Sequence, residues 1–234
     1  MLPHGIYPRI VALILFISCA MDLHAQGVWD GVPTIAPSGI IGATGTEVSP
    51  GPGFPPANLD FGGTLALHGH TVAAGMAAFG DHVGRVAIFV RDSSGDWIRN
   101  GTLDPSDGQP WDFFGGRLAL WGDEALVASQ QGIYVFHQFG THWQQVQKLP
   151  STAETPLSGD LALSEHWAFI GNSVPGKPGE VRVYELGRHG KLHEVKVLDS
   201  HTGVPDDGFG THIAFSHSTL LIGAPQDNSS PGAA

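Results

Sequence analysis

Acidic side chains in short loops are the first candidates for chemistry in this 234-residue chain. A positioned carboxyl group can donate or accept a proton during hydrolysis. The residues placed for such a role are Glu124, Glu165, Asp206 and Asp207. The sequence contains no Gly-x-Ser-x-Gly elbow, no His-Glu-x-x-His helix and no phosphate-binding glycine loop. We therefore expect no catalytic residue here, and we keep these four for the alternative that the chain belongs to an enzyme.

Histidines are the second group of candidates, since the chain holds 13 of them. His68 and His70 are the weak candidates for a metal site, because alternate residues of an extended strand face the same side. Other closely spaced histidines lie in hairpins or at strand ends without a matching carboxylate or thiol, and we expect them to be solvated. These are His137, His142, His189 and His193. We predict no bound cofactor.

The elements that must position these residues form an internal repeat. Four stretches share a large apolar residue, small residues and an alternating apolar run, at 61–67, 114–120, 157–163 and 209–215. A second apolar run ends fourteen positions after the start of each stretch, at Gly75, Ala128, Gly171 and Gly223. A third run begins at Gly84, Gly132 and Gly179, and a weaker fourth covers 97–103, 143–149 and 192–198. Four short strands in each unit of about 40 to 50 residues are typical of propeller blades.

We therefore predict an all-β fold of β-propeller blades with four antiparallel strands each, of which about 3.5 are present. The units are 58–112, 113–156, 157–208 and, in part, 209–234. The fourth unit stops where the earlier units enter their third strand. Because an open array leaves unpaired strand edges, we expect either a fragment of a longer propeller, which we favour, or self-association of copies through the open blade edges.

The repeat resembles the FG-GAP family, which forms the blades of integrin-α-type β-propellers and of many exported bacterial proteins. The fourth unit carries the motif most clearly, with Phe209-Gly210 followed by Gly223-Ala224-Pro225. We expect the aromatic ring to wedge between sheets while glycine lets a neighbouring backbone approach. The structural repeat positions are Phe61, Gly62, Gly75, Phe114, Gly115, Gly171, Phe209, Gly210, Gly223, Ala224 and Pro225. The third unit departs from the motif with Leu157-Ser158, and we expect it to pack less tightly.

The resemblance raises calcium as a candidate cofactor. Family members that bind calcium carry an Asp-rich loop between the first two strands of a blade, and this sequence has none there. Two other acidic segments, Asp104-Pro105-Ser106-Asp107-Gly108 and Asp206-Asp207-Gly208, could hold a cation weakly. Turn formation by Asp, Pro and Gly is the favoured interpretation of both.

The first residues resemble a secretory signal peptide. Arg9 precedes the apolar run at 10–17, and small or polar residues follow it up to a cleavage site between Ala25 and Gln26. We predict a signal peptide at 1–25 and a secreted, periplasmic or cell-surface protein. The alternative is a lipoprotein anchored through Cys19, the single cysteine. Residues 26–57 are rich in Gly and Pro and are interpreted as a lead-in.

Composition narrows the class of partner. A formal net charge of -11 argues against nucleic acid and anionic membranes. We predict a noncatalytic binding or adhesion module that presents loops to a protein or glycan ligand. Aromatic side chains supply contact area in such sites, and the exposed candidates are Trp111, Trp121 and Trp167. The alternative is part of an exported enzyme whose catalytic residues lie outside this chain or need further blades.

Overall fold

The computed structural model describes residues 60–152, 157, 159–173, 176–200 and 204–225, together with the backbone of Val11 and Ala12. The predicted signal cleavage site, Cys19 and the lead-in at 26–57 lie outside these residues. The described chain is all-β, with one short helix, α1 (Phe79–His82), and one 3-10 turn, η1 (Arg188–Gly190). Within the described residues, no helix reaches the length and apolar character that crossing a membrane requires.

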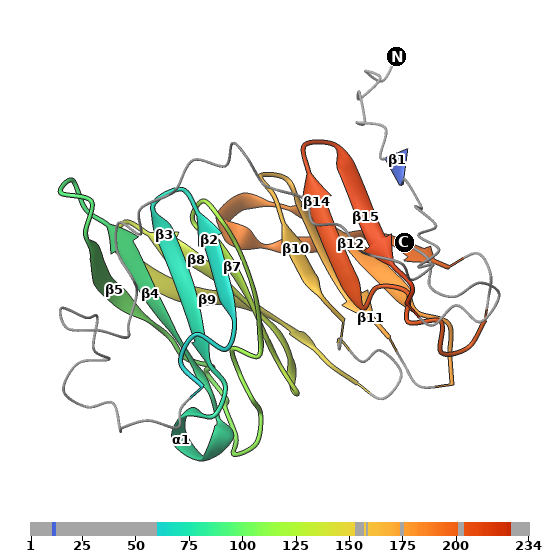
Figure 1. Ribbon diagram of the computed structural model, residues 1–234, viewed down its shortest axis with the longest axis horizontal. Coiled ribbons are helices and arrows are strands. Elements are labelled where there is room, and N and C mark those ends of the chain that lie inside the picture. Colours follow the sequence, from blue (N-terminus) through green and yellow to red (C-terminus); the bar gives the residue numbers. More distant parts are fainter. Residues whose placement is uncertain are drawn as a thin grey trace, which may run out of the picture.

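Four sheets follow one another along the chain (Figure 1). Sheet I consists of β2 (Leu65–His68), β3 (Thr71–Met76), β4 (Arg85–Arg91) and β5 (Trp97–Leu103). Sheet II consists of β6 (Arg117–Trp121), β7 (Glu124–Ser129), β8 (Gly132–Phe139) and β9 (His142–Pro150). Sheet III consists of β10 (Leu161–Leu163), β11 (Trp167–Asn172), β12 (Glu180–Leu186) and β13 (Leu192–Asp199). Sheet IV consists of β14 (His212–Ser216), β15 (Thr219–Gly223) and the parallel β1 (Val11–Ala12).

Sheets I to III are the predicted blades, because each contains four antiparallel strands paired in sequence order. The strands predicted from the repeats are confirmed in all four units. Their second strands read as continuous apolar runs, as in β7, where Ala125 to Ala128 are all buried. A strand buried on both faces needs no polar alternation, since a neighbouring sheet covers each side.

Three apolar layers hold the sheets together. The layer between sheets I and II contains Val86 and Ile88 from one side and Tyr134 and Phe136 from the other. Equivalent layers join sheet II to sheet III and sheet III to sheet IV. The array is open, because no apolar cluster among the described residues joins sheet I to sheet IV.

The repeated spacing in the sequence accompanies a hydrogen bond inside each unit, whose donor and acceptor are 13 residues apart in the first, second and fourth units and 12 in the third. The amide of a glycine at the start of the unit donates to the carbonyl oxygen at the end of the second strand, over 2.9 to 3.0 Å. The donor and acceptor pairs are Gly62 with Gly75, Gly115 with Ala128, Gly159 with Gly171, and Gly210 with Gly223. Each bond ties the entry loop of its unit to the hairpin that the first two strands form.

Two of the three motif phenylalanines lie between sheets. Phe114 is fully buried in the layer between sheets I and II, and Phe209 is 6% exposed between sheets III and IV. Phe61 is only partly buried and packs edge-on against Phe89. Leu157 takes the phenylalanine position in the third unit and is 6% exposed within the layer between sheets II and III.

Candidate functional site

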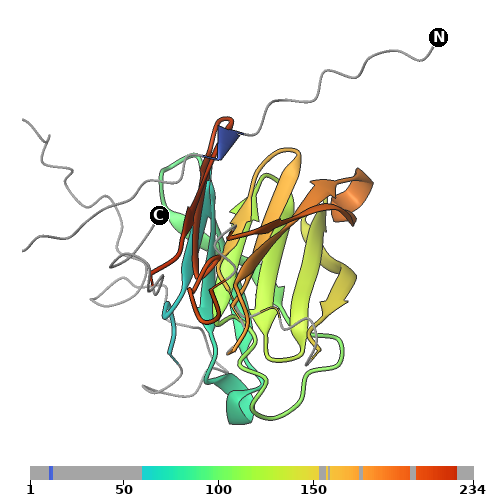
Figure 2. The same ribbon diagram turned by 90° about the vertical axis from the view of Figure 1, so that its right-hand side faces the viewer.

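The turns that join the first two strands of each unit gather at one end of the array. Figure 2 shows these turns at the end opposite to α1. They lie between β2 and β3, β6 and β7, β10 and β11, and β14 and β15. We call this end of the array the hairpin-tip face. Consecutive sheets therefore bring the same short segment of each repeat to neighbouring positions.

A groove of about 450 Å³ opens between the tips of sheets II, III and IV. Its size lies within the range of small-molecule sites in proteins. Apolar surface comes from aromatic rings, and polar groups come from the turns between strands. The side chains that matter for binding are Trp121, Trp167, Phe215, Glu165, His166 and His217.

Trp121 is held in place from sheet I. The ring of His68 lies 4.3 Å from the ring of Trp121, measured between centroids. The Gly122 amide also donates a hydrogen bond to His68 Nδ1 over 2.8 Å. This bond makes Nδ1 an acceptor and places the imidazole beside the indole. His68 therefore positions Trp121, which remains 37% exposed to a ligand.

Trp167 is fixed by the turn that precedes it. The Ser164 hydroxyl donates to the Trp167 carbonyl oxygen and accepts from the Trp167 amide, over 3.2 and 3.1 Å. The Ser164 amide also donates to the same carbonyl oxygen over 2.8 Å. Ser164 is itself buried, so the turn is tied to the sheet at its base. These bonds hold the indole against the layer shared with sheet IV.

Trp111 lies away from the groove. Its ring stacks on His82, with centroids 4.3 Å apart and planes 9° from parallel. Since His82 ends α1, this stack lies at the end of the array opposite to the hairpin-tip face. Two of the three aromatic candidates thus line one groove, and the third is separate and 60% exposed.

Glu124 makes a partnership that the sequence analysis missed. Its Oε1 lies 2.8 Å from Nδ1 of His137 on the next strand. The prediction that His137 lacks a carboxylate partner was therefore wrong. The pairing register across β7 and β8 explains this, because directly opposed residues share a face. A search for acidic and histidine residues at opposed positions of the predicted strands would have found the pair.

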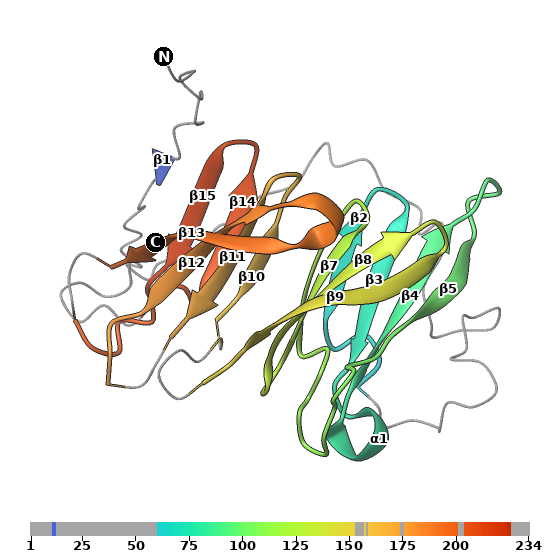
Figure 3. The same ribbon diagram turned by 180° about the vertical axis from the view of Figure 1, so that it is seen from behind.

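Burial dominates the electrostatics of this pair. Desolvation raises the pKa of Glu124 above its ordinary value, while the hydrogen bond from His137 acts in the opposite direction. Glu124 Oε2 is buried without a hydrogen-bond partner among the described residues. The η1 turn of sheet III reaches over to sheet II (Figure 3), and the ring of His189 lies 5.3 Å from that of His137. Glu124, His137 and His189 therefore form a contact between sheets II and III.

The other two acidic candidates stabilise loops. Asp206 Oδ1 accepts a hydrogen bond from the Gly176 amide over 2.6 Å. Asp207 is fully buried, and its Oδ1 accepts from the amides of Gly179 and Phe209 over 2.9 and 3.0 Å. These bonds fix the loop that leads into Phe209-Gly210. The acidic segment thus forms a turn, as the sequence analysis expects.

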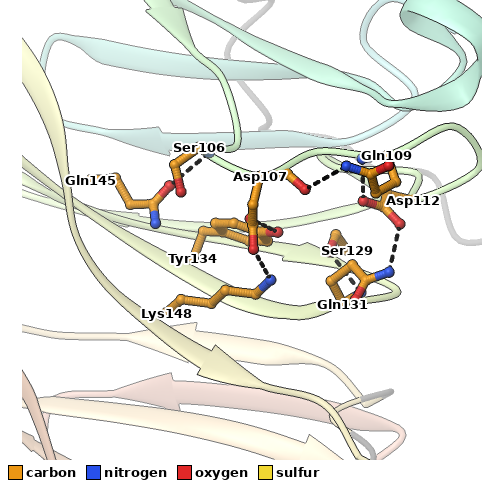
Figure 4. Close-up of polar contacts among 9 residues, drawn as sticks. All are labelled: Ser106, Asp107, Gln109, Asp112, Ser129, Gln131, Tyr134, Gln145 and Lys148. Atoms are coloured by element: carbon orange, nitrogen blue, oxygen red, sulfur yellow. Dashed lines mark hydrogen bonds and ion pairs between the residues drawn. The ribbon is translucent and has the colours of Figure 1, made fainter.

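The acidic segment at 104–108 is tied to its surroundings by side-chain contacts (Figure 4). The Tyr134 hydroxyl donates to Asp107 Oδ1 over 2.8 Å, and Lys148 Nζ donates to Oδ2 over 2.7 Å. These two bonds hold the pKa of Asp107 below its ordinary value. Asp104 Oδ1 forms an ion pair with Nε of Arg85. Both carboxylates thus have protein partners that anchor the loop.

No group of three or more His, Cys, Asp or Glu residues that could hold a metal ion occurs in the part of the chain that the structure describes. His68 engages Trp121 and Gly122, as described above. His70 is exposed beside the first hairpin turn. The structure therefore does not bring a third ligand to the pair that the sequence singled out.

Comparisons with known proteins give no family for this chain. The sequence matches no family model and no curated protein. A europium-containing methanol dehydrogenase resembles it with a TM-score of 0.42 and 14% identity, over 60% of this chain and 26% of that one. A putative 6-phosphogluconolactonase from Bacteroides fragilis resembles it with a TM-score of 0.37 and 11% identity, over 68% and 61%. The chain thus spans less than two thirds of either structure, and neither likeness bears on its function.

Proposed function

We propose that this chain is a noncatalytic binding module that takes a sugar unit of a glycan in the groove of the hairpin-tip face. The observation that carries the proposal is the placement of Trp121 and Trp167, from consecutive sheets, in one groove with Phe215. Rigid aromatic rings offer large contact area at low entropic cost. No other function is supported as directly by the described side chains.

The groove matches the chemistry of a sugar ring. A pyranose presents C–H groups on its faces and hydroxyl groups on its rim. Aromatic faces can cover the C–H groups, while a few polar side chains fix the orientation of the hydroxyls. Glu165, His166 and His217 supply acceptors and donors at the rim of this groove.

The acidic residues favour binding over turnover. Glycoside hydrolysis generally uses two carboxyl groups on opposite sides of the scissile bond. Among the described residues that line the groove, Glu165 is the one carboxylate. Glu124 is bonded to His137, and Asp207 is bonded to backbone amides. Glu124 and Asp207 were both acid or base candidates in the sequence, and these hydrogen bonds give each of them a structural role.

We also propose that the chain is related to the FG-GAP family and that it is exported. FG-GAP kinship is supported by the motif residues Phe114 and Phe209, which lie between sheets in the manner that the resemblance implies. Export is supported by the signal-like segment at 1–25. An extracellular binding module would meet glycans on cell surfaces or in the surrounding matrix.

Binding to an array of glycans tests the proposal, followed by calorimetry with each hit. Trp121→Ala and Trp167→Ala should each weaken binding by about tenfold or more, the scale of a lost aromatic anchor. Trp111→Ala is the matched control, because that indole is more exposed but lies at the opposite end of the array. An equal loss of glycan affinity in all three variants would contradict binding in the groove. Turnover of a bound glycan that disappears in Glu165→Gln would favour the enzyme alternative.

A further inference from the structure

Each end sheet of the open array exposes apolar residues that belong to a repeated interface between sheets. On sheet I, Leu65 and Leu67 point away from sheet II and are 64% and 65% exposed. They share their face with Ala74 and Val72, their register partners on β3. Val72 and Ala74 are themselves buried in an apolar cluster with Phe89, so the leucine pair is the exposed edge of this face. A solvent-exposed leucine pair at the edge of an apolar face marks an interaction surface.

The internal interfaces show what covers this pair of positions. The equivalent residues in sheets II to IV are buried against the preceding sheet, as for Leu120 (7% exposed), Leu161 (6%), Leu163 (9%) and Ile213 (8%). In the preceding sheet, the second strand supplies the covering side chain. That side chain is Ala73 in sheet I, Leu126 in sheet II and Phe169 in sheet III, each at most 1% exposed.

Sheet IV presents the covering side without a partner among the described residues. Its residue at the position of Ala73, Leu126 and Phe169 is Leu221, which is 38% exposed. Ala214, the register partner of Leu221, is exposed on the same face. Sheet IV therefore exposes the kind of face that covers the leucine positions of the next sheet at the internal interfaces.

The repeated glycines lead to the same conclusion. At the internal interfaces, a Cβ atom on Gly75 would overlap the carbonyl oxygen of Gly115, and one on Gly171 would overlap that of Gly210. The open ends carry the two halves of this contact. Among the described residues, a Cβ atom on Gly62 would meet only Leu65 at 3.9 Å, and one on Gly223 only His212 at 3.5 and 3.7 Å.

We propose that a second copy of this chain docks head to tail, with sheet IV of one copy against sheet I of the other. Leu221 would cover Leu65 and Leu67, and Gly223 would approach Gly62 as Gly75 approaches Gly115. Such an interface joins different surfaces of the two copies, and it closes a ring when the rotation permits. Two copies bring together about eight sheets, within the range of four to eight blades that closes a propeller.

Sedimentation velocity of the whole 234-residue chain over a range of concentrations tests the proposal. The parent should form a reversible dimer. Leu67→Glu and Leu221→Glu should each weaken it by about 30-fold or more, the scale of a hot-spot residue. Gly223→Ala should weaken it too, while the thermal melt of the monomer stays unchanged because the added methyl group makes ordinary contacts.

Val195→Glu is the matched control, because Val195 is 50% exposed on the outer strand of sheet III and lies outside the proposed interface. It should leave the dimer unchanged. Mixing the Leu67→Glu and Leu221→Glu chains should restore a mixed dimer, since one native interface remains between them. A parent that stays monomeric would overturn the proposal. So would a dimer that survives Leu221→Glu, because that result indicates pairing of two sheet I faces.

Discussion

Gly75 on sheet I lies against Gly115 of the second unit so closely that a Cβ atom at position 75 would overlap the Gly115 carbonyl oxygen. Gly115 itself has a φ of 92°, in the region that favours glycine. A side chain at position 115 would also lie 3.0 Å from the carbonyl oxygen of Arg85. The motif glycines thus set how closely adjacent sheets approach.

Gly75→Ala should therefore lower the free energy of unfolding. The methyl group must push two backbones apart, and overpacking of this kind costs about 1–3 kcal/mol. Gly223→Ala occupies the same repeat position without a covering sheet among the described residues, so it should leave the stability of the monomer nearly unchanged. Urea denaturation of both variants in dilute solution measures the difference. Equal effects would show that the close approach is not what requires glycine at position 75.

Glu124→Gln should change how stability depends on pH. Because burial raises the pKa of Glu124 in the folded state, this group favours folding below its unfolded pKa and loses that contribution as the pH rises through the folded pKa. The variant cannot ionise, so it should gain thermal stability relative to the parent between about pH 4.5 and pH 7. The charged and titratable neighbours are His137, His189 and Asp123, which remain in both proteins.

Thermal melts of the parent and the Glu124→Gln variant at several pH values measure this gain. The matched control is Asp123→Asn, which removes the neighbouring charge and leaves the hydrogen bond between Glu124 and His137 intact. A constant difference in melting temperature between parent and Glu124→Gln would contradict the raised pKa of Glu124.

Tyr134→Phe should loosen the loop at 104–112. The fully buried tyrosine loses its hydrogen bond to Asp107, which is worth about 1 kcal/mol. Lys148→Met removes the ion pair to the same carboxylate, but Asp107 is 53% exposed there, so a smaller effect is expected. Limited proteolysis of the loop and urea denaturation report both changes. A larger effect from Lys148→Met would mean that the ion pair, and not the tyrosine, anchors the loop.

The sequence predicts the strands well because each unit repeats the same local pattern. The fourteen-residue offset between Phe61 and Gly75 corresponds to a hairpin with a fixed hydrogen bond, which is a local feature. Apolar runs such as 125–128 likewise indicate a strand that is buried on both faces. The local pattern therefore predicts the strands and their grouping into sheets.

The candidate site was only partly predictable. Trp121 and Trp167 were recognised as exposed aromatic candidates, but their meeting in one groove depends on how sheets II and III are placed side by side. The contact between His68 and Trp121 likewise joins two units 53 residues apart in the repeat, which no local pattern encodes. The pair of Glu124 and His137 was accessible from strand register alone, and it was missed because the histidines were considered without their opposed residues.

Tryptophan fluorescence during titration with a soluble glycan that binds the parent tests the central claim most directly. If the groove of Trp121 and Trp167 holds the sugar, the parent should show a saturable change in emission that is lost in the double variant Trp121→Phe, Trp167→Phe. The variant Trp111→Phe should keep that change with an unaltered dissociation constant. A change that persists in the double variant, or that disappears with Trp111, would contradict binding at the hairpin-tip face.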